Sequence, residues 1–178
     1  MFESNRYQVR EKSFSDGDQH EIYEDGELVL YSKIDNSEIR NDLLFVDKEE
    51  NTKLVVTSHP KLDVPVSYSI IDKETEETIG GLRKEGGTIK QEWKLIDGNN
   101  TIIATVKEDH LSLSLARRFL TTLIPFKYDV VSKKEEKIAD IDGEIKLRDI
   151  YNIDICGDID PRLIVPAAVI IDSIERKM

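Results

Sequence analysis

The sequence contains few of the residues that form covalent or metal cross-links. Among its 178 residues there are one cysteine and three histidines. The single cysteine, Cys156, excludes an internal disulfide bond, and the histidines His20, His59 and His110 stand far apart without the spacing of a zinc site. We therefore expect no metal and no cofactor.

Positive charge is also scarce. The chain has 25 Lys+Arg against 36 Asp+Glu, which gives a formal net charge of -11. Such a chain repels phosphate backbones, which argues against sequence-independent nucleic-acid binding. The N-terminal residues Met1 to Arg6 lack the charged and apolar regions of a signal peptide. The length suits one domain, residues 1–178, and we expect it to be cytoplasmic.

No apolar run is long enough to span a membrane, which takes about 20 residues. The most apolar segment, Leu163 to Ile171, stops at Asp172. Asp160-Pro161 before it is typical of a helix start, because aspartate caps free N–H groups and proline needs none there. Apolar side chains lie on every side of this helix, so it must be enclosed. We predict a buried helix at about residues 160–177, or one that begins only at Pro166, since an internal proline should kink it.

The rest of the chain has the alternating, β-branched pattern of strands joined by polar turns. A unit of two apolar residues, a polar turn and a second apolar run occurs five times, with the turn following Tyr23, Val46, Ile71, Ile96 and Val131. The first four of these positions are 23, 25 and 25 residues apart, a period that fits one hairpin and its connection. Adding the runs 6–12 and 144–155 gives twelve strands.

Twelve antiparallel strands could form a sandwich or a barrel, and the enclosed helix favours the barrel. A helix is roughly 10–12 Å across with its side chains, so a twelve-stranded barrel can hold one along its axis. The Asp-Gly pairs at 25–26, 97–98 and 142–143 suit tight hairpin turns. Trp93 has the parity of an inward-facing residue and should pack against the helix. The fold prediction is a closed, mainly β, twelve-stranded antiparallel barrel around a C-terminal helix.

One further segment, Leu111 to Ile124, has helical periodicity and is amphipathic. It would either pack on the barrel or lie on a membrane with its cations on lipid headgroups. Arg117 and Arg118, with Lys127 just beyond, form the best cationic patch in the sequence. These three residues are the candidate contacts to anionic phospholipid.

The order and spacing of the motifs resemble the LURP-one-related family, which belongs to the tubby C-terminal-like superfamily together with the phospholipid scramblases. The resemblance spans the chain and is carried by Tyr7 to Lys12 with Phe14 and Asp16 to Asp18, by the hairpin Ile22 to Gly26, and by the closing helix at 160–172. It implies a non-enzymatic barrel, with phosphoinositide binding in tubby domains and calcium-linked lipid movement in scramblases. The proline-rich region and acylated cysteine cluster of scramblases are absent, and the tubby lipid-contact motif has no match.

Three acidic or glycine-containing motifs have simple structural interpretations. Asp140 to Glu144 resembles the opening of a calcium loop, but Tyr151 stands where that loop needs a glutamate, so a hairpin turn is the preferred interpretation. Gly80-Gly81 is expected at a strand bend or bulge. Asp172 is expected near the barrel end, satisfied by a backbone donor or water, and no catalytic base or nucleophile is visible beside it in sequence.

These observations lead to two functional hypotheses. The first is a non-catalytic, tubby-like binding module for anionic phospholipid, cytoplasmic and at most peripheral to a membrane. The second is a small-ligand or protein-interaction barrel with no membrane role, whose acidic exterior meets a cationic partner. Clustered cations near an apolar rim would favour the first, and scattered cations the second.

Overall fold

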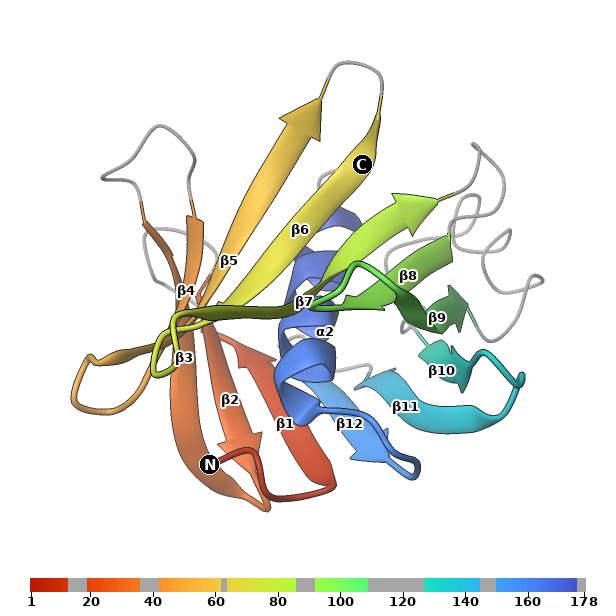
Figure 1. Ribbon diagram of the computed structural model, residues 1–178. Coiled ribbons are helices and arrows are strands. Elements are labelled where there is room, and N and C mark those ends of the chain that lie inside the picture. Colours follow the sequence, from red (N-terminus) through yellow and green to blue (C-terminus); the bar gives the residue numbers. More distant parts are fainter. Residues whose placement is uncertain are drawn as a thin grey trace.

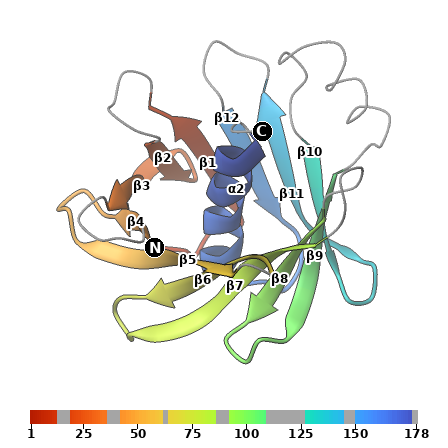
Figure 2. The same ribbon diagram turned by 90° about the horizontal axis from the view of Figure 1, so that it is seen from above.

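A closed barrel of antiparallel strands surrounds a single helix in the computed structural model, which describes residues 1–12, 19–35, 42–61, 64–85, 92–108, 127–144 and 150–175 (Figures 1 and 2). The strands are β1 (Arg6–Glu11), β2 (His20–Glu24), β3 (Glu27–Asp35), β4 (Asp42–Val46), β5 (Thr52–Lys61), β6 (Val64–Asp72), β7 (Glu77–Glu85), β8 (Glu92–Asp97), β9 (Ile102–Glu108), β10 (Lys127–Ser132), β11 (Lys137–Glu144) and β12 (Ile150–Ile155), and the helix is α2 (Pro161–Glu175). The amphipathic segment predicted at 111–124 lies outside the described residues.

Each strand pairs with the next one along the chain, and β1 pairs with β12 to close the barrel. The closing register places Tyr7 opposite Ile153 and Val9 opposite Tyr151. Because closure leaves no strand edge exposed, the barrel is protected from edge-to-edge association. The predicted twelve-stranded antiparallel barrel is confirmed.

The five sequence units share one local structure. In every unit the register shifts by a β-bulge between the two apolar residues that precede the turn, at Ile22/Tyr23, Phe45/Val46, Ile70/Ile71, Leu95/Ile96 and Val130/Val131. The first residue of each pair is fully buried. A bulge adds one residue and increases the local twist, so repeating it helps the sheet to curl into a barrel.

The turns of these units also repeat. Each contains one non-glycine residue with positive φ: Asp25, Glu50, Glu76, Asn100 and Glu135. In three turns the residue after the unit's second apolar residue is an aspartate whose Oδ1 accepts backbone N–H groups of the turn: Asp47, Asp72 and Asp97. Ser132 Oγ takes the same role in the fifth unit. Much of the regular acidity of the sequence is therefore turn chemistry.

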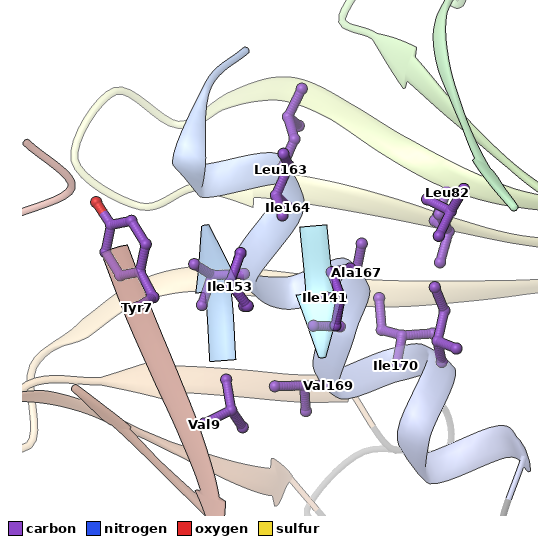
Figure 3. Close-up of a cluster of buried hydrophobic side chains, with 14 of the residues drawn as sticks. Tyr7, Val9, Leu82, Ile141, Ile153, Leu163, Ile164, Ala167, Val169 and Ile170 are labelled. Atoms are coloured by element: carbon purple, nitrogen blue, oxygen red, sulfur yellow. The ribbon is translucent and has the colours of Figure 1, made fainter. Parts of the chain in front are cut away.

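The helix fills the barrel as the sequence predicts. Residues 163–172 of α2 are all buried, and Figure 3 shows Val169 pointing toward Val9 of the wall. Asp160 caps the helix, since its Oδ1 accepts the Arg162 backbone N–H at 2.9 Å. The helix begins at Pro161 and contains Pro166, so the alternative start at Pro166 is wrong.

Side-chain size in the wall follows the position of the helix. The backbone of α2 comes closest to β7, β1 and β12. On β7, a Cβ at Gly80 would lie 2.3 Å from Ile96 O and 2.9 Å from Leu163 Cδ2, so only glycine fits there. The largest fully buried side chains, Trp93 and Phe45, stand on β8 and β4, whose backbones approach α2 less closely than those of β7, β1 and β12. The predicted inward position of Trp93 in the barrel lining is confirmed, since it is 1% exposed, and its packing against the helix stays a prediction.

One predicted turn is wrong. Asp142-Gly143, and with it the segment Asp140 to Glu144, belongs to strand β11 and pairs with neighbours on both sides. Asp142 lies opposite Lys127 and Asn152, and the Lys127 ammonium is 3.2 Å from its Oδ1. The alternation of buried Ala139 and Ile141 with outward aspartates is a strand pattern, which here prevails over the turn preference of an Asp-Gly pair.

Within the described ranges, no helix is both long and apolar enough to cross a membrane.

Candidate functional site

Four polar side chains meet inside the barrel, at the end where α2 finishes and β2 begins. They are His20 of β2, Ser32 of β3, Tyr151 of β12 and Asp172 of α2, and none is more than 5% exposed. Buried polar groups in an apolar core require partners, because an unpaired one costs free energy. We call these four residues the buried network.

The contacts of the network are specific. Ser32 Oγ lies 3.0 Å from His20 Nδ1 and accepts the His20 backbone N–H at 3.0 Å. His20 Nε2 lies 3.3 Å from Asp172 Oδ2. The Tyr151 hydroxyl donates to the other carboxylate oxygen, Asp172 Oδ1. One chain of contacts therefore joins two neighbouring strands, the helix and β12.

A single protonation pattern satisfies these contacts without a buried cation. If His20 is neutral with its proton on Nε2, that N–H donates to Asp172 while Nδ1 accepts the Ser32 hydroxyl proton. Ser32 Oγ remains an acceptor for the His20 backbone N–H. For a neutral ring, this is the tautomer whose donors and acceptors match the contacts.

Local sequence explains how each side chain reaches the interior. His20 stands two residues before Ile22 and directly opposite Ser32, which follows Leu30 by two, so all four face inward on paired strands. Tyr151 precedes Ile153 in the same way on β12. Asp172 directly follows the buried run of α2. Strand alternation and barrel closure then bring residues from the two ends of the chain together.

The network contains the side chains of a serine hydrolase triad but cannot work as one in this state. Ser32 is 0% exposed and Asp172 is 4% exposed, so neither meets a substrate. Ser32 also lies within a paired strand, not on a turn that would present its oxygen. What the arrangement can do is fix the axial position and rotation of α2 against three strands.

Sequence reasoning missed this site. Asp172 was expected to meet a backbone donor or water, and no base or nucleophile beside it was visible in the sequence; the structure shows that the side chains of His20 and Tyr151 are partners of its carboxylate. The signal present in the sequence was strand alternation: His20 and Ser32 occupy inward-facing positions between apolar residues. A polar side chain at such a position requires a buried partner.

The other end of α2 is held by an ion cluster. Arg162 Nη1 lies 2.6 Å from Asp72 Oδ2, and Arg162 Nη2 lies 2.6 Å from Asp160 Oδ2. Burial raises the pKa of Asp72, but the N–H groups of Glu74 and Thr75 and the Arg162 guanidinium lower it more. The third hairpin turn is thereby tied to the start of the helix.

The first unit uses the equivalent acidic position differently. Glu24 accepts the backbone N–H groups of Glu3 and Ser4, at 2.7 and 3.0 Å, and the Tyr7 hydroxyl at 3.0 Å. Burial raises the pKa of Glu24, but these hydrogen bonds lower it by more. The pKa of Tyr7 is raised, first by burial and then by its hydrogen bond to Glu24. Glu24 therefore fastens the N-terminal segment to the barrel as an ionised group.

The predicted lipid contacts are not brought together in the described residues. Arg117 and Arg118 lie outside them. Lys127 is the first residue of β10, 42% exposed, and its ammonium is 3.2 Å from Asp142 Oδ1. Lysines elsewhere on the wall are likewise next to carboxylates, in the pairs Lys33–Glu50, Lys53–Asp47, Lys94–Glu92, Lys107–Glu135 and Lys137–Asp140. The described part of the chain has no group of three His, Cys, Asp or Glu residues that could hold a metal ion.

Comparison with known proteins agrees with this architecture. The sequence profile of the LURP-one-related family matches residues 5–172. The chain is also similar to the X-ray structure of a protein from Arabidopsis thaliana, with a TM-score of 0.63 over 98% of this chain and 94% of that one. At 11% identity this likeness shows a shared fold. No curated protein matches the chain.

Proposed function

Because the chain belongs to the LURP-one-related family and folds as a closed barrel with a filled interior, we propose that it is a non-catalytic binding module. The main support for this proposal is the burial of the network, in which Ser32, His20 and Asp172 are 0%, 2% and 4% exposed. A hydrolase needs its nucleophile at a surface that substrate reaches. Since these residues hold the helix in place, a macromolecular partner would be recognised by the outer surface.

A labelling experiment tests the non-catalytic part of the proposal. A fluorophosphonate probe, which reacts with activated serines, is applied to the intact chain and to a Ser32→Ala variant. We expect no labelling of the intact chain beyond that of the variant. Labelling that maps to Ser32 by mass spectrometry would mean that the network opens and is reactive, and would overturn the proposal.

The distribution of charge favours a positively charged protein partner over a membrane surface. Lysines of four different strands, β3, β8, β9 and β10, lie beside carboxylates, and the whole chain carries a formal charge of -11. A lipid site needs several cations gathered on one face. A basic partner gains from the same acidic exterior through faster, salt-dependent association.

Anionic phospholipid is the second candidate, supported by the family resemblance and by the sequence patch Arg117, Arg118 and Lys127. Each such cation near an anionic surface contributes about 1 kcal/mol, so the three give roughly 3 kcal/mol. That permits weak, salt-sensitive association and not stable anchoring. The protein would then be peripheral to the membrane.

Liposome sedimentation separates the two candidates. Vesicles of phosphatidylcholine alone and with phosphatidylserine are tested at low and high salt, with the parent chain, an Arg117→Glu/Arg118→Glu double variant and, as a control, Lys107→Glu on β9. Binding that needs phosphatidylserine, falls with salt and is lost only in the double variant would establish the lipid role. Equal, negligible sedimentation of all three would remove that role and leave the basic protein partner.

A further inference from the structure

Three side chains near the loop end of the barrel, where α2 finishes, form a cluster apart from the buried network. They are Tyr68 of β6, Lys84 of β7 and Trp93 of β8. Lys84 is the direct cross-strand partner of Trp93, and its Nζ lies 5.2 Å from the centre of the indole ring. The Tyr68 and Trp93 rings are 6.5 Å apart and tilted by 42°. Three adjacent strands thus present two aromatic rings and an ammonium group together.

The cluster contains hydrogen-bond donors that the described protein does not satisfy. Trp93 is 1% exposed, and within the described residues its Nε1 is buried without an acceptor. The Tyr68 hydroxyl also forms no hydrogen bond within the described residues, but Tyr68 is half-buried and can meet solvent. Burial raises the pKa of Tyr68. A fully buried donor such as the Trp93 N–H is nearly always paired in folded proteins, because burial removes the water that would otherwise accept its hydrogen bond. An acceptor from outside the chain would restore that balance.

The chemistry of the cluster defines this acceptor. Two donors and a cation suit the two oxygens of a carboxylate, and charge-assisted hydrogen bonds are the stronger kind. One ammonium in a chain of net charge -11 favours a single negative charge over a phosphate dianion. Leu82 and Leu95, opposite each other on β7 and β8, are 0% exposed and belong to the packed core, so the apolar body of a ligand would lie against the half-buried Tyr68 ring.

We propose that Tyr68, Lys84 and Trp93 bind a small monocarboxylate with an apolar body. Tyr68 and Lys84 are half-buried and meet solvent, while Trp93 lies deeper, so the ligand enters past the first two and its carboxylate reaches the indole N–H. Lys84 has a further contact of its own, and the site uses its positive charge without requiring a free ammonium. The site lies inside the wall, independent of the outer surface that serves the proposed binding function.

The single tryptophan of the chain makes the test direct, because all indole emission comes from Trp93. Octanoate is titrated into the full chain while this emission is followed, with octanol and octylammonium as neutral and cationic probes of equal length. We expect a saturable spectral change and a raised melting temperature with octanoate only. No saturable change, or an equal response to octanol, would overturn the proposal.

Two variants of matched chemistry locate the site. Lys84→Gln removes the inner ammonium, whereas Lys94→Gln removes an ammonium from the outer face of the neighbouring strand, where Lys94 contacts Glu92 and Thr105. Octanoate affinity should fall at least tenfold in the first and stay unchanged in the second. Tyr68→Phe, measured by calorimetry, should weaken binding several-fold while the thermal melt stays cooperative. Equal affinities in the Lys84 and Lys94 variants would place octanoate elsewhere and refute the site.

Discussion

Replacing Asp172 with alanine should strongly destabilise the protein, although this residue touches no ligand. The change removes the carboxylate that accepts from His20 Nε2 and from the Tyr151 hydroxyl, both buried. Depriving a buried donor of its acceptor costs about 1–3 kcal/mol, so the two together cost about 2–6 kcal/mol. That is a large part of the roughly 5–15 kcal/mol by which domains are stable.

Thermal melting followed by circular dichroism measures the effect. For a chain of this size each kcal/mol lowers the melting temperature by about 2–4 °C, so a fall of roughly 5 to 20 °C is expected. Ser173→Ala, one residue along the same helix, is the matched control and should melt within about 2 °C of the parent, as is usual away from buried polar groups.

A double-mutant cycle then isolates the contact. Tyr151→Phe should destabilise the parent, because Asp172 loses a donor, but cost much less in the Asp172→Ala background, where the hydroxyl no longer has this acceptor. Additive costs in the cycle, or an Asp172→Ala melt equal to that of Ser173→Ala, would refute the view that the network holds the helix.

Three further changes probe the barrel. Ile170→Asp should unfold the domain, since Ile170 is 3% exposed and an unpaired buried charge costs several kcal/mol, and an unchanged melt would show that α2 is not central. Glu24→Gln should lower the free energy of unfolding at neutral pH and flatten the acid limb of a stability-against-pH curve. The pKa of Glu24 is lowered in the folded state. Its contribution to stability is therefore present above the ordinary pKa of 4.5 and is lost as pH falls through the folded pKa. Parallel acid limbs for parent and variant would contradict this. Gly80→Ala should lower the urea midpoint, because its Cβ would lie 2.3 Å from Ile96 O and 2.9 Å from Leu163 Cδ2. An undisturbed midpoint would reject the close-packing argument.

The sequence by itself determined the class of fold. Strand alternation, five repeated units and one helix apolar on all sides are local patterns, and each follows from which face of an element must be buried. The repeats predicted the hairpins, and the structure adds that each carries a bulge at the same step, as at Ile70/Ile71. Asp142-Gly143 was misassigned because a turn motif was considered without the strand pairing on both sides of it.

Which polar residues meet depends on how the whole barrel closes around the helix. His20 and Asp172 are 152 positions apart, and Tyr151 joins them only because barrel closure places β12 beside β1. Alternation can say that His20 faces inward, but the depth and rotation of α2 choose its partner. The same holds for Trp93, since alternation predicts that it faces inward but not that its N–H is buried without an acceptor among the described residues. Side-chain pairing across a barrel is set by register and closure, which are properties of the whole sheet and not of any one segment.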